Sequence, residues 1–236
     1  MITTIAFDAD DTLWHTESLF VETQARLVAI LERYAPHGEV VARLQETEER
    51  NLAFFGYGIK GFILSMVETA IEISRRQVHA DEIHEIMMMG KAMLEAPLHL
   101  LDGVIPALDA LAGRHRLMLI TKGDLLDQTN RIEKSGLAER FAHIEVVSRK
   151  NPETYRRIFA GQGLAPAEVV MVGNSIPSDI LPILEIGGHG VHIPYVVTAA
   201  FERHEALPRH ERFHQLAAIG EVPALIRRLT FPSPAL

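Results

Sequence analysis

The stretch that decides this fold is Ile5-Ala6-Phe7-Asp8-Ala9-Asp10-Asp11-Thr12-Leu13-Trp14. The residues from Ile2 to Phe7 are apolar or β-branched, and such a run predicts a strand buried on both faces, as in a parallel sheet. The run ends in three carboxylates, and the carboxyl ends of such strands are where open α/β sheets bind ligands. A hard divalent cation such as Mg²⁺ would neutralise these crowded carboxylates. The alternative is an acidic turn, because Asp is common in turns.

The composition is that of an ordinary globular protein, with 47% hydrophobic and 23% charged residues among 236. A formal net charge of −8 argues against a nucleic-acid polymer or an anionic membrane held by bulk charge. The chain has no cysteine, which excludes disulfides, thiolate metal ligands and a cysteine nucleophile. Because no segment resembles a leader or a membrane span, we expect a cytoplasmic protein with no membrane partner. The oligomeric state stays open between a monomer and a homodimer.

The next eighty or so residues read as helix, with no strand pattern among them. Apolar residues recur at helical spacing, and Pro36 and Gly38 mark one helix end. The expected helices are Glu17–Ala35, Glu39–Arg50, Phe62–Ile73 and Ala80–Glu95. We therefore expect a helical cap domain over residues 15–97.

From Gly103 onward, helices and strands alternate. The expected strands are Leu117–Ile120, Ile144–Val147, Val169–Val172 and Val191–Ile193. The expected helices are Pro106–Ala112, Leu125–Lys134, Pro152–Ala160, Pro177–Ile186 and Pro223–Leu229. Such alternation is typical of parallel βαβ units with helices on both faces. The sequence thus predicts an α/β fold: a Rossmann-like, doubly wound parallel sheet formed by residues 1–14 and 98–236, with the helical cap inserted after its first strand.

Polar residues follow each expected strand. They are Asp8 and Asp10 after the first, Thr121, Lys122 and Gly123 after the second, Lys150 after the third, and Asn174 and Asp179 after the fourth. Because the ends of parallel strands meet at one edge of the sheet, these groups should converge on one site. Carboxylates, a hydroxyl, amides before a helix and an ammonium group together suit a metal ion and a phosphate.

At these residues the chain resembles the haloacid dehalogenase superfamily. Its first motif, two aspartates around one residue and then a threonine, matches residues 8–12. Thr121 matches the second motif, Lys150 the third, and the stretch from Gly173 to Asp179 the fourth, in the same order. The helical block resembles the C1-type cap of the family's first subfamily. The resemblance covers nearly the whole chain.

The resemblance implies phosphoryl transfer through an aspartyl-phosphate. Asp8 would be the nucleophile and Asp10 the general acid and then base. Thr121 and the amides that follow it, at Lys122 and Gly123, would hold the phosphoryl oxygens. Lys150 would offset the charge of the nucleophile and the phosphate.

The same resemblance implies a Mg²⁺ site. Its ligands would be an Asp8 carboxylate oxygen, the Asp10 carbonyl, Asp179 and waters. Asn174 stands where the family's fourth motif often has aspartate, so one negative charge is missing and metal affinity would be weaker. Asp11 and Asp124 could compensate, although each also suits a turn or a helix cap.

The second aspartate favours a phosphatase acting on a small phosphorylated metabolite. Dehalogenases of this superfamily lack an acid at the position of Asp10, so that activity is less expected. A sugar phosphomutase uses the same aspartates and stays open, as do other hydrolases of the superfamily. A non-catalytic binding module is a further alternative, against which intact Asp8 and Asp10 argue.

Two literal motif matches suggest other functions. Gly56-Tyr57-Gly58-Ile59-Lys60-Gly61 has the spacing of a dinucleotide-binding loop, but helices lie on both sides where that motif needs a strand before it. We expect a cap loop in which Tyr57 and Lys60 contact the substrate, or else a solvated connection. His210-Glu211-Arg212-Phe213-His214 matches a zinc-protease signature, yet no third ligand follows it, and chance is the better explanation.

Overall fold

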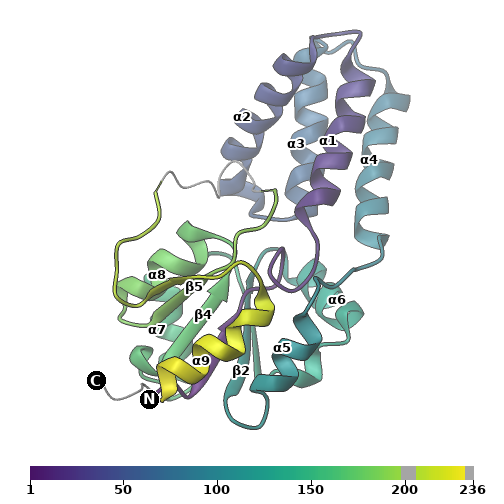
Figure 1. The fold of residues 1–236 in the computed structure, drawn as a ribbon. Coiled ribbons are helices and arrows are strands. Elements are labelled where there is room, and N and C mark those ends of the chain that lie inside the picture. The colour runs from purple at the N-terminus through teal and green to yellow at the C-terminus, as the bar shows by residue number, and fades with distance from the viewer. Residues whose placement is uncertain (198–205, 232–236) are drawn as a thin grey trace.

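The protein, represented by a computed structural model, is built on one six-stranded parallel sheet (Figure 1). The structure describes residues 1–197 and 206–231. Its strands are β1 (Thr4–Phe7), β2 (Arg116–Lys122), β3 (His143–Val147), β4 (Val169–Gly173), β5 (His189–His192) and β6 (Phe213–Gln215). They lie in the order β3-β2-β1-β4-β5-β6. The chain builds outward on one side of β1 and then crosses to the other, so the strand order reverses at β1, where such sheets bind ligands.

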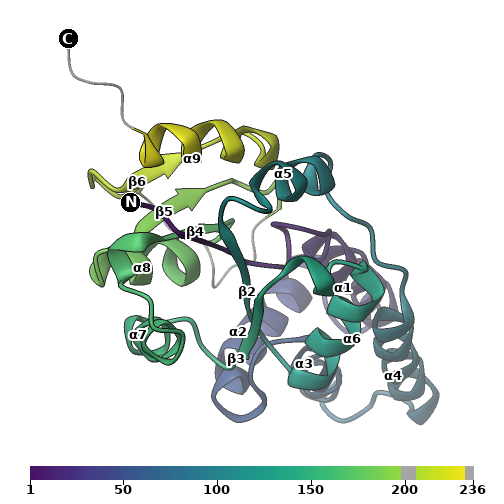
Figure 2. The same cartoon turned by 90° about the horizontal axis from the view of Figure 1, so that it is seen from below.

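Helices cover both faces of this sheet. They are α5 (Val104–Leu111), α6 (Leu125–Ser135), α7 (Pro152–Gly161), α8 (Leu181–Glu185) and α9 (Val222–Thr230). Ile5 and Phe7 of β1 belong to the hydrophobic cluster that contains α5, α6 and α9. Ala6, which points the other way, belongs to the cluster that contains α7 and α8. Figure 2 shows the two groups of helices on opposite sides of the sheet, which confirms the predicted doubly wound, Rossmann-like α/β fold.

The four helices between β1 and α5 form a bundle with its own hydrophobic core. They are α1 (Glu17–Leu31), α2 (His37–Phe55), α3 (Ile59–Ile73) and α4 (Ala80–Glu95), here called the helical insertion. Buried side chains at helical spacing, such as Leu27 with Leu31 and Phe62 with Met66, face one another in its centre. Figure 1 shows this bundle beyond one end of the sheet. Two chain segments join it to the core, and the His15 N–H donates to the His99 carbonyl between them at 3.0 Å.

The main difference from the sequence-based expectation is β6. This strand has only three residues, of which two are polar, so no apolar run reveals it. The expected helix at Pro177–Ile186 is a turn of π-helix, Ile176–Ile180, that runs into α8. No helix among the described residues is long and apolar enough to cross a membrane.

Candidate active site

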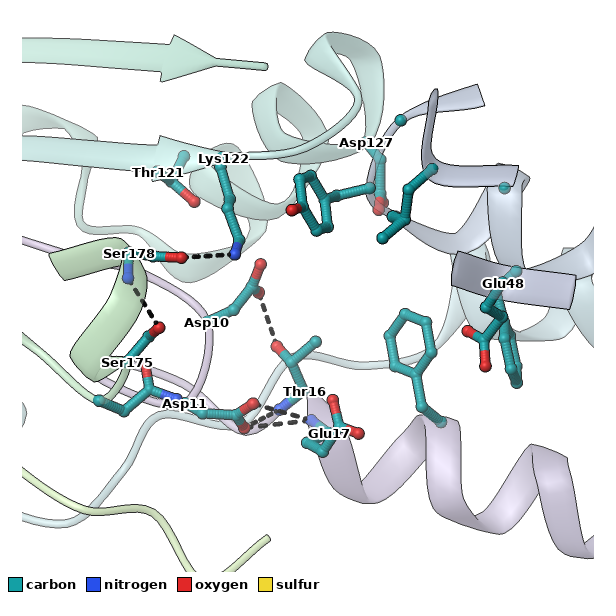
Figure 3. A pocket seen from close by; sticks show the side chains of 18 of the residues that line it. Asp10, Asp11, Thr16, Glu17, Glu48, Thr121, Lys122, Asp127, Ser175 and Ser178 are labelled. Atoms are coloured by element: carbon teal, nitrogen blue, oxygen red, sulfur yellow. Dashed lines mark hydrogen bonds between the residues drawn. The ribbon is translucent and has the colours of Figure 1, made fainter. Parts of the chain in front are cut away.

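A cavity of about 310 Å³ lies between the carboxyl edge of the sheet and the helical insertion. The predicted site residues that line it are Asp8, Asp10, Tyr57, Thr121, Lys122, Lys150, Asn174 and Asp179. Figure 3 shows the Asp10, Thr121 and Lys122 side chains on one side of this space, with Glu48 of α2 on the other. The parallel topology explains the convergence, because it brings the ends of β1, β2 and β4 to the same edge.

Lys150 joins two buried carboxylates at the base of the cavity. Its Nζ donates to Asp8 Oδ1, and to Asp179 Oδ1 at 2.7 Å. All three side chains are almost fully shielded from solvent. A buried ammonium group is stable only when paired, and this geometry holds it between the end of β1 and the π-helical turn before α8.

Burial and the neighbouring charges act together on the pKa values of Asp8 and Lys150. It raises the pKa of Asp8 to about 7, against the opposing effect of Lys150, and the charge of Asp179 adds to the rise. For Lys150, burial lowers the pKa, but the Asp179 and Asp8 carboxylates outweigh it and the net pKa is raised. One ammonium group thus incompletely compensates two buried carboxylates, and a cation or a shared proton relieves their repulsion.

The oxygen donors around Asp8 fit a Mg²⁺ ion. The described residues contain no group of three or more His, Asp and Glu side chains arranged to hold a metal. Asp8 and Asp179 nevertheless supply two carboxylates, and Mg²⁺ is usually bound through one or two carboxylates plus water and substrate phosphate. Asn174 lines the same cavity, and its Oδ1 accepts a hydrogen bond from Thr12 Oγ1 at 3.3 Å.

Asp10 is oriented by four donors. Its Oδ1 accepts from Trp14 Nε1 at 2.8 Å, from Thr16 Oγ1 at 2.6 Å and from Arg131 Nη1 at 3.4 Å. Its Oδ2 accepts from Gln128 Nε2 at 2.7 Å. None of these four donors was predicted from the sequence. The only signal in the sequence is that Gln128 and Arg131 lie three residues apart, and hence on one face, in the helix that follows Thr121.

Thr121 and Gly123 occupy the end of β2. The Thr121 hydroxyl is buried and donates to Gln128 Oε1 at 3.2 Å, so Gln128 bridges Thr121 and Asp10. The Gly123 N–H donates to the Val147 carbonyl at 3.0 Å, and Gly123 does not line the cavity. Thr121 therefore lines the cavity at this strand end, and Gly123 does not.

Lys122 carries a second ammonium group into the cavity. Its Nζ donates to Ser178 Oγ at 2.8 Å (Figure 3). The same Nζ lies 4.3 Å from the centre of the Tyr57 ring. Burial lowers the pKa of Lys122 to about 8, and the nearby charge of Lys150 contributes to the decrease. Tyr57 belongs to the loop between α2 and α3, so this cation–π contact joins the insertion to the core.

The remaining candidates serve other contacts. Lys60 does not line the cavity, and its Nζ forms an ion pair with Asp124 Oδ1 at 2.8 Å. Asp124 also begins α6, where it accepts the Asp127 N–H at 3.0 Å. Asp11 binds the first amides of α1, with the Thr16 N–H donating to its Oδ1 at 2.8 Å. Asp11 and Asp124 thus both hold helix starts.

The histidine pair of the zinc-protease signature does not lie on one helix. His210 lies before β6, and His214 lies within it. The His214 ring stacks on His189 of β5, with ring centres 6.0 Å apart. The signature requires both histidines on the same helical face, which this segment does not provide.

Solved structures of low sequence identity share this fold. An L-2-haloacid dehalogenase from Xanthobacter autotrophicus, with chloropropionic acid covalently bound, is 18% identical, with TM-score 0.62 over 96% of this chain and 99% of that one. A HAD phosphatase from Thermococcus onnurineus is 17% identical, with TM-score 0.59 over 95% and 98%. No curated protein matches the chain by sequence. At these identities the likeness concerns the fold alone.

Two findings go further than the fold. Residues 2–187 match the family model of the haloacid dehalogenase-like hydrolases. A haloacid dehalogenase-like family hydrolase of known structure from Xanthomonas campestris is 39% identical, with TM-score 0.86 over 97% of this chain and 91% of that one. The family match includes both aspartates of the first motif and the strand ends that carry Thr121, Lys150 and Asp179. The chain belongs to the haloacid dehalogenase-like hydrolases.

Proposed function

We propose that this hydrolase is a Mg²⁺-dependent phosphatase that cleaves the phosphate monoester of a small metabolite. The observation that carries the proposal is the pair Asp8 and Asp10, which face the same cavity with different partners. Asp8 is held by Lys150, as suits a nucleophile, and Asp10 is held by uncharged donors and Arg131, as suits a group that moves protons.

The reaction would take place in two displacements. An Asp8 carboxylate oxygen attacks phosphorus, and the bond from phosphorus to the ester oxygen breaks as Asp10 gives its proton to the departing alcohol. Asp10 then removes a proton from water, which attacks phosphorus. The acyl-phosphate bond breaks, and inorganic phosphate and the free Asp8 carboxylate result. Lys150 and the Thr121 hydroxyl would bind the phosphoryl oxygens throughout. Mg²⁺, held by Asp8, Asp179 and the Asp10 carbonyl, would neutralise charge and orient the phosphate.

Asp10 is the feature that favours a phosphate ester over a haloacid. An alkoxide is a strongly basic leaving group and needs a proton, whereas a halide ion leaves without one. A carboxylate fixed by four donors beside the nucleophile can give a proton to a departing alkoxide, a step that the departure of a halide does not need.

The test is hydrolysis of 4-nitrophenyl phosphate by the parent protein and by Asp8→Asn, with and without Mg²⁺. We expect phosphate release that needs the metal and falls at least about a thousandfold in the variant, because the nucleophile is lost. Asp109→Asn, at an exposed carboxylate paired with Arg140, is the matched control and should keep the parent rate.

Two further measurements distinguish a phosphatase that acts through Asp8 from a dehalogenase. Intact-mass analysis of acid-quenched parent protein should show one added phosphoryl group, absent from Asp8→Asn. Chloride release from 2-chloropropionate should be undetectable. Metal-independent chloride release, or full phosphatase activity in Asp8→Asn, would contradict the proposal.

A further inference from the structure

The cavity continues from the catalytic carboxylates into the helical insertion, where apolar side chains form part of its lining. The apolar side chains there are Phe20, Val21, Val41, Leu52 and Phe62. The Phe20 and Phe62 rings pack with their centres 4.9 Å apart. A phosphoryl group bound at Asp8 would direct the rest of the substrate into this part of the cavity, so its lining determines which leaving groups fit.

Charges are distributed unevenly along the cavity. Among the described residues, the cationic ones that line it, Lys122, Lys150 and Arg131, all belong to the core, which also contributes five aspartates. The charged residues that line it from the insertion are all acidic: Glu17, Glu48 and Glu49. The core end thus supplies the cationic groups that a phosphate needs, whereas the charged groups of the insertion end are all carboxylates, which disfavour a second anion.

Among these three glutamates, Glu48 is the one placed to contact the leaving group. Figure 3 shows its side chain across the cavity from Asp10 and Lys122. It is partly buried, and it makes no hydrogen bond or ion pair with any residue in the described ranges. Its neighbour Glu49 is exposed and accepts a hydrogen bond from Gln45 at 3.1 Å.

An unpaired, partly buried carboxylate is costly, because it loses water without gaining a donor. Burial, with a smaller contribution from Glu49, raises the pKa of Glu48 to about 7. Asn51, about one turn further along α2, does not relieve this cost, because its Nδ2 donates to Ser65 Oγ at 3.1 Å and to Glu68 Oε2 at 2.8 Å instead. A cationic ligand group would supply the missing partner.

We propose that the substrate is the phosphate monoester of an amino alcohol. Its ammonium group binds Glu48, and its carbon chain lies along the apolar side chains of the insertion, such as Phe20 and Phe62. This inference rests on the proposed phosphatase function, since it identifies the leaving group of that reaction. An ammonium group gains both charge attraction and a hydrogen bond at Glu48, a hydroxyl gains only the bond, and a carboxylate meets like charge.

The first experiment measures binding without turnover. Alkyl phosphonates that end in an amine, a hydroxyl or a carboxyl group are titrated calorimetrically at neutral pH, across a series of chain lengths. At the best length we expect the amine to bind about 10- to 30-fold tighter than the hydroxyl compound, and the carboxylate most weakly. In Glu48→Gln the preference for the amine should disappear. Glu46→Gln, on the exposed side of the same helix, should keep it.

The second experiment repeats the comparison with the corresponding phosphate esters and measures kcat/KM. The ratio of amine to hydroxyl ester should fall to near one in Glu48→Gln. The inference would be overturned if the parent cleaved the esters with all three end groups equally well, or if Glu48→Gln lowered kcat/KM by the same factor for all three. Selective binding of the amine without ester cleavage would instead refute the phosphatase function, so the two failures are distinguishable.

Discussion

At the scale of single residues, burial determines the behaviour of several carboxyl groups in this protein. It raises the pKa of Asp8, Asp11 and Glu48 to about 7 in each case. Asp8 has Lys150, and Asp11 has the amides of Thr16 and Glu17, yet burial outweighs both. Within the part of the chain that the structure describes, Glu48 has no such partner. Its charge is therefore the simplest to isolate by mutation.

Glu48→Gln should stabilise the protein at high pH but not at low pH. The pKa of Glu48 is higher in the folded protein than its ordinary value of 4.5. The folded protein therefore binds this proton more tightly than the unfolded chain does, and the stability that this contributes is fully present below pH 4.5 and is lost as pH rises through about 7. Glutamine stays neutral. We expect a gain in the free energy of unfolding on the order of 1 to 2 kcal/mol at about pH 8, and little at about pH 5.

Thermal unfolding in metal-free buffer at the two pH values measures this gain, which corresponds to several degrees in Tm for a chain of this size. Glu46→Gln, with an exposed carboxylate 3.5 Å from Arg43, should follow the parent at both pH values. The same Tm difference between Glu48→Gln and the parent at both pH values would contradict the prediction.

At the scale of elements, the sequence predicts what local patterning determines. The buried strands β1 and β4 have continuous apolar runs, and the helices of the insertion have apolar residues at helical spacing. Strand β6 has neither, because it lies at the edge of the sheet and pairs with β5 through three residues. The π-helical turn at Ile176–Ile180 was also not predicted, since it depends on how Asp179 is held beneath β4.

Gly173, at the end of β4, leaves the space that Asp179 occupies. A Cβ atom at Gly173 would lie 2.2 Å from Asp179 Oδ2, which accepts the Ser175 N–H at 3.0 Å. Gly173→Ala should therefore displace Asp179, and Lys150 would then lose one of its two carboxylate partners. We expect a loss of about 1 to 3 kcal/mol in stability and of about 100-fold in kcat, measured by denaturant unfolding and phosphate release.

Gly161→Ala is the matched control for that substitution. Gly161 ends α7, and a Cβ atom there would meet nothing within 4 Å. This variant should keep the parent rate and gain up to about 1 kcal/mol, because alanine has fewer unfolded conformations than glycine. A Gly173→Ala protein as active and as stable as the parent would show that Asp179 can move without consequence.

At the scale of the whole molecule, the convergence of Asp8, Thr121, Lys150 and Asp179 could be predicted because a parallel sheet forces strand ends to one edge. What lies opposite them could not. Which side of α2 faces the cavity, and hence the place of Glu48, depends on how the insertion packs against the core rather than on any motif. The partners of Asp10 on α6 were missed for the same reason, because their contacts join segments far apart in the sequence.

The ion pair between Lys60 and Asp124 joins the insertion to the core, close to the cap loop whose Gly58 lines the cavity. Both side chains are partly exposed, at 47% and 31%, and such pairs contribute about 0.2 to 1 kcal/mol. If the pair holds the insertion over a bound substrate, Lys60→Met should raise KM about two- to five-fold and change kcat little. Asp124→Asn, which can still cap α6, should have the same effect.

The double variant then decides between two roles for Lys60. If Lys60 acts through Asp124, the double variant should be no worse than either single one, and added salt should raise the parent's KM toward theirs. If Lys60 contacts the substrate directly, Lys60→Met should exceed Asp124→Asn, and the two effects should add. Steady-state kinetics of the four proteins at low and high ionic strength separates these outcomes, because a pair that closes the cavity and a residue that binds the ester predict opposite results for the double variant.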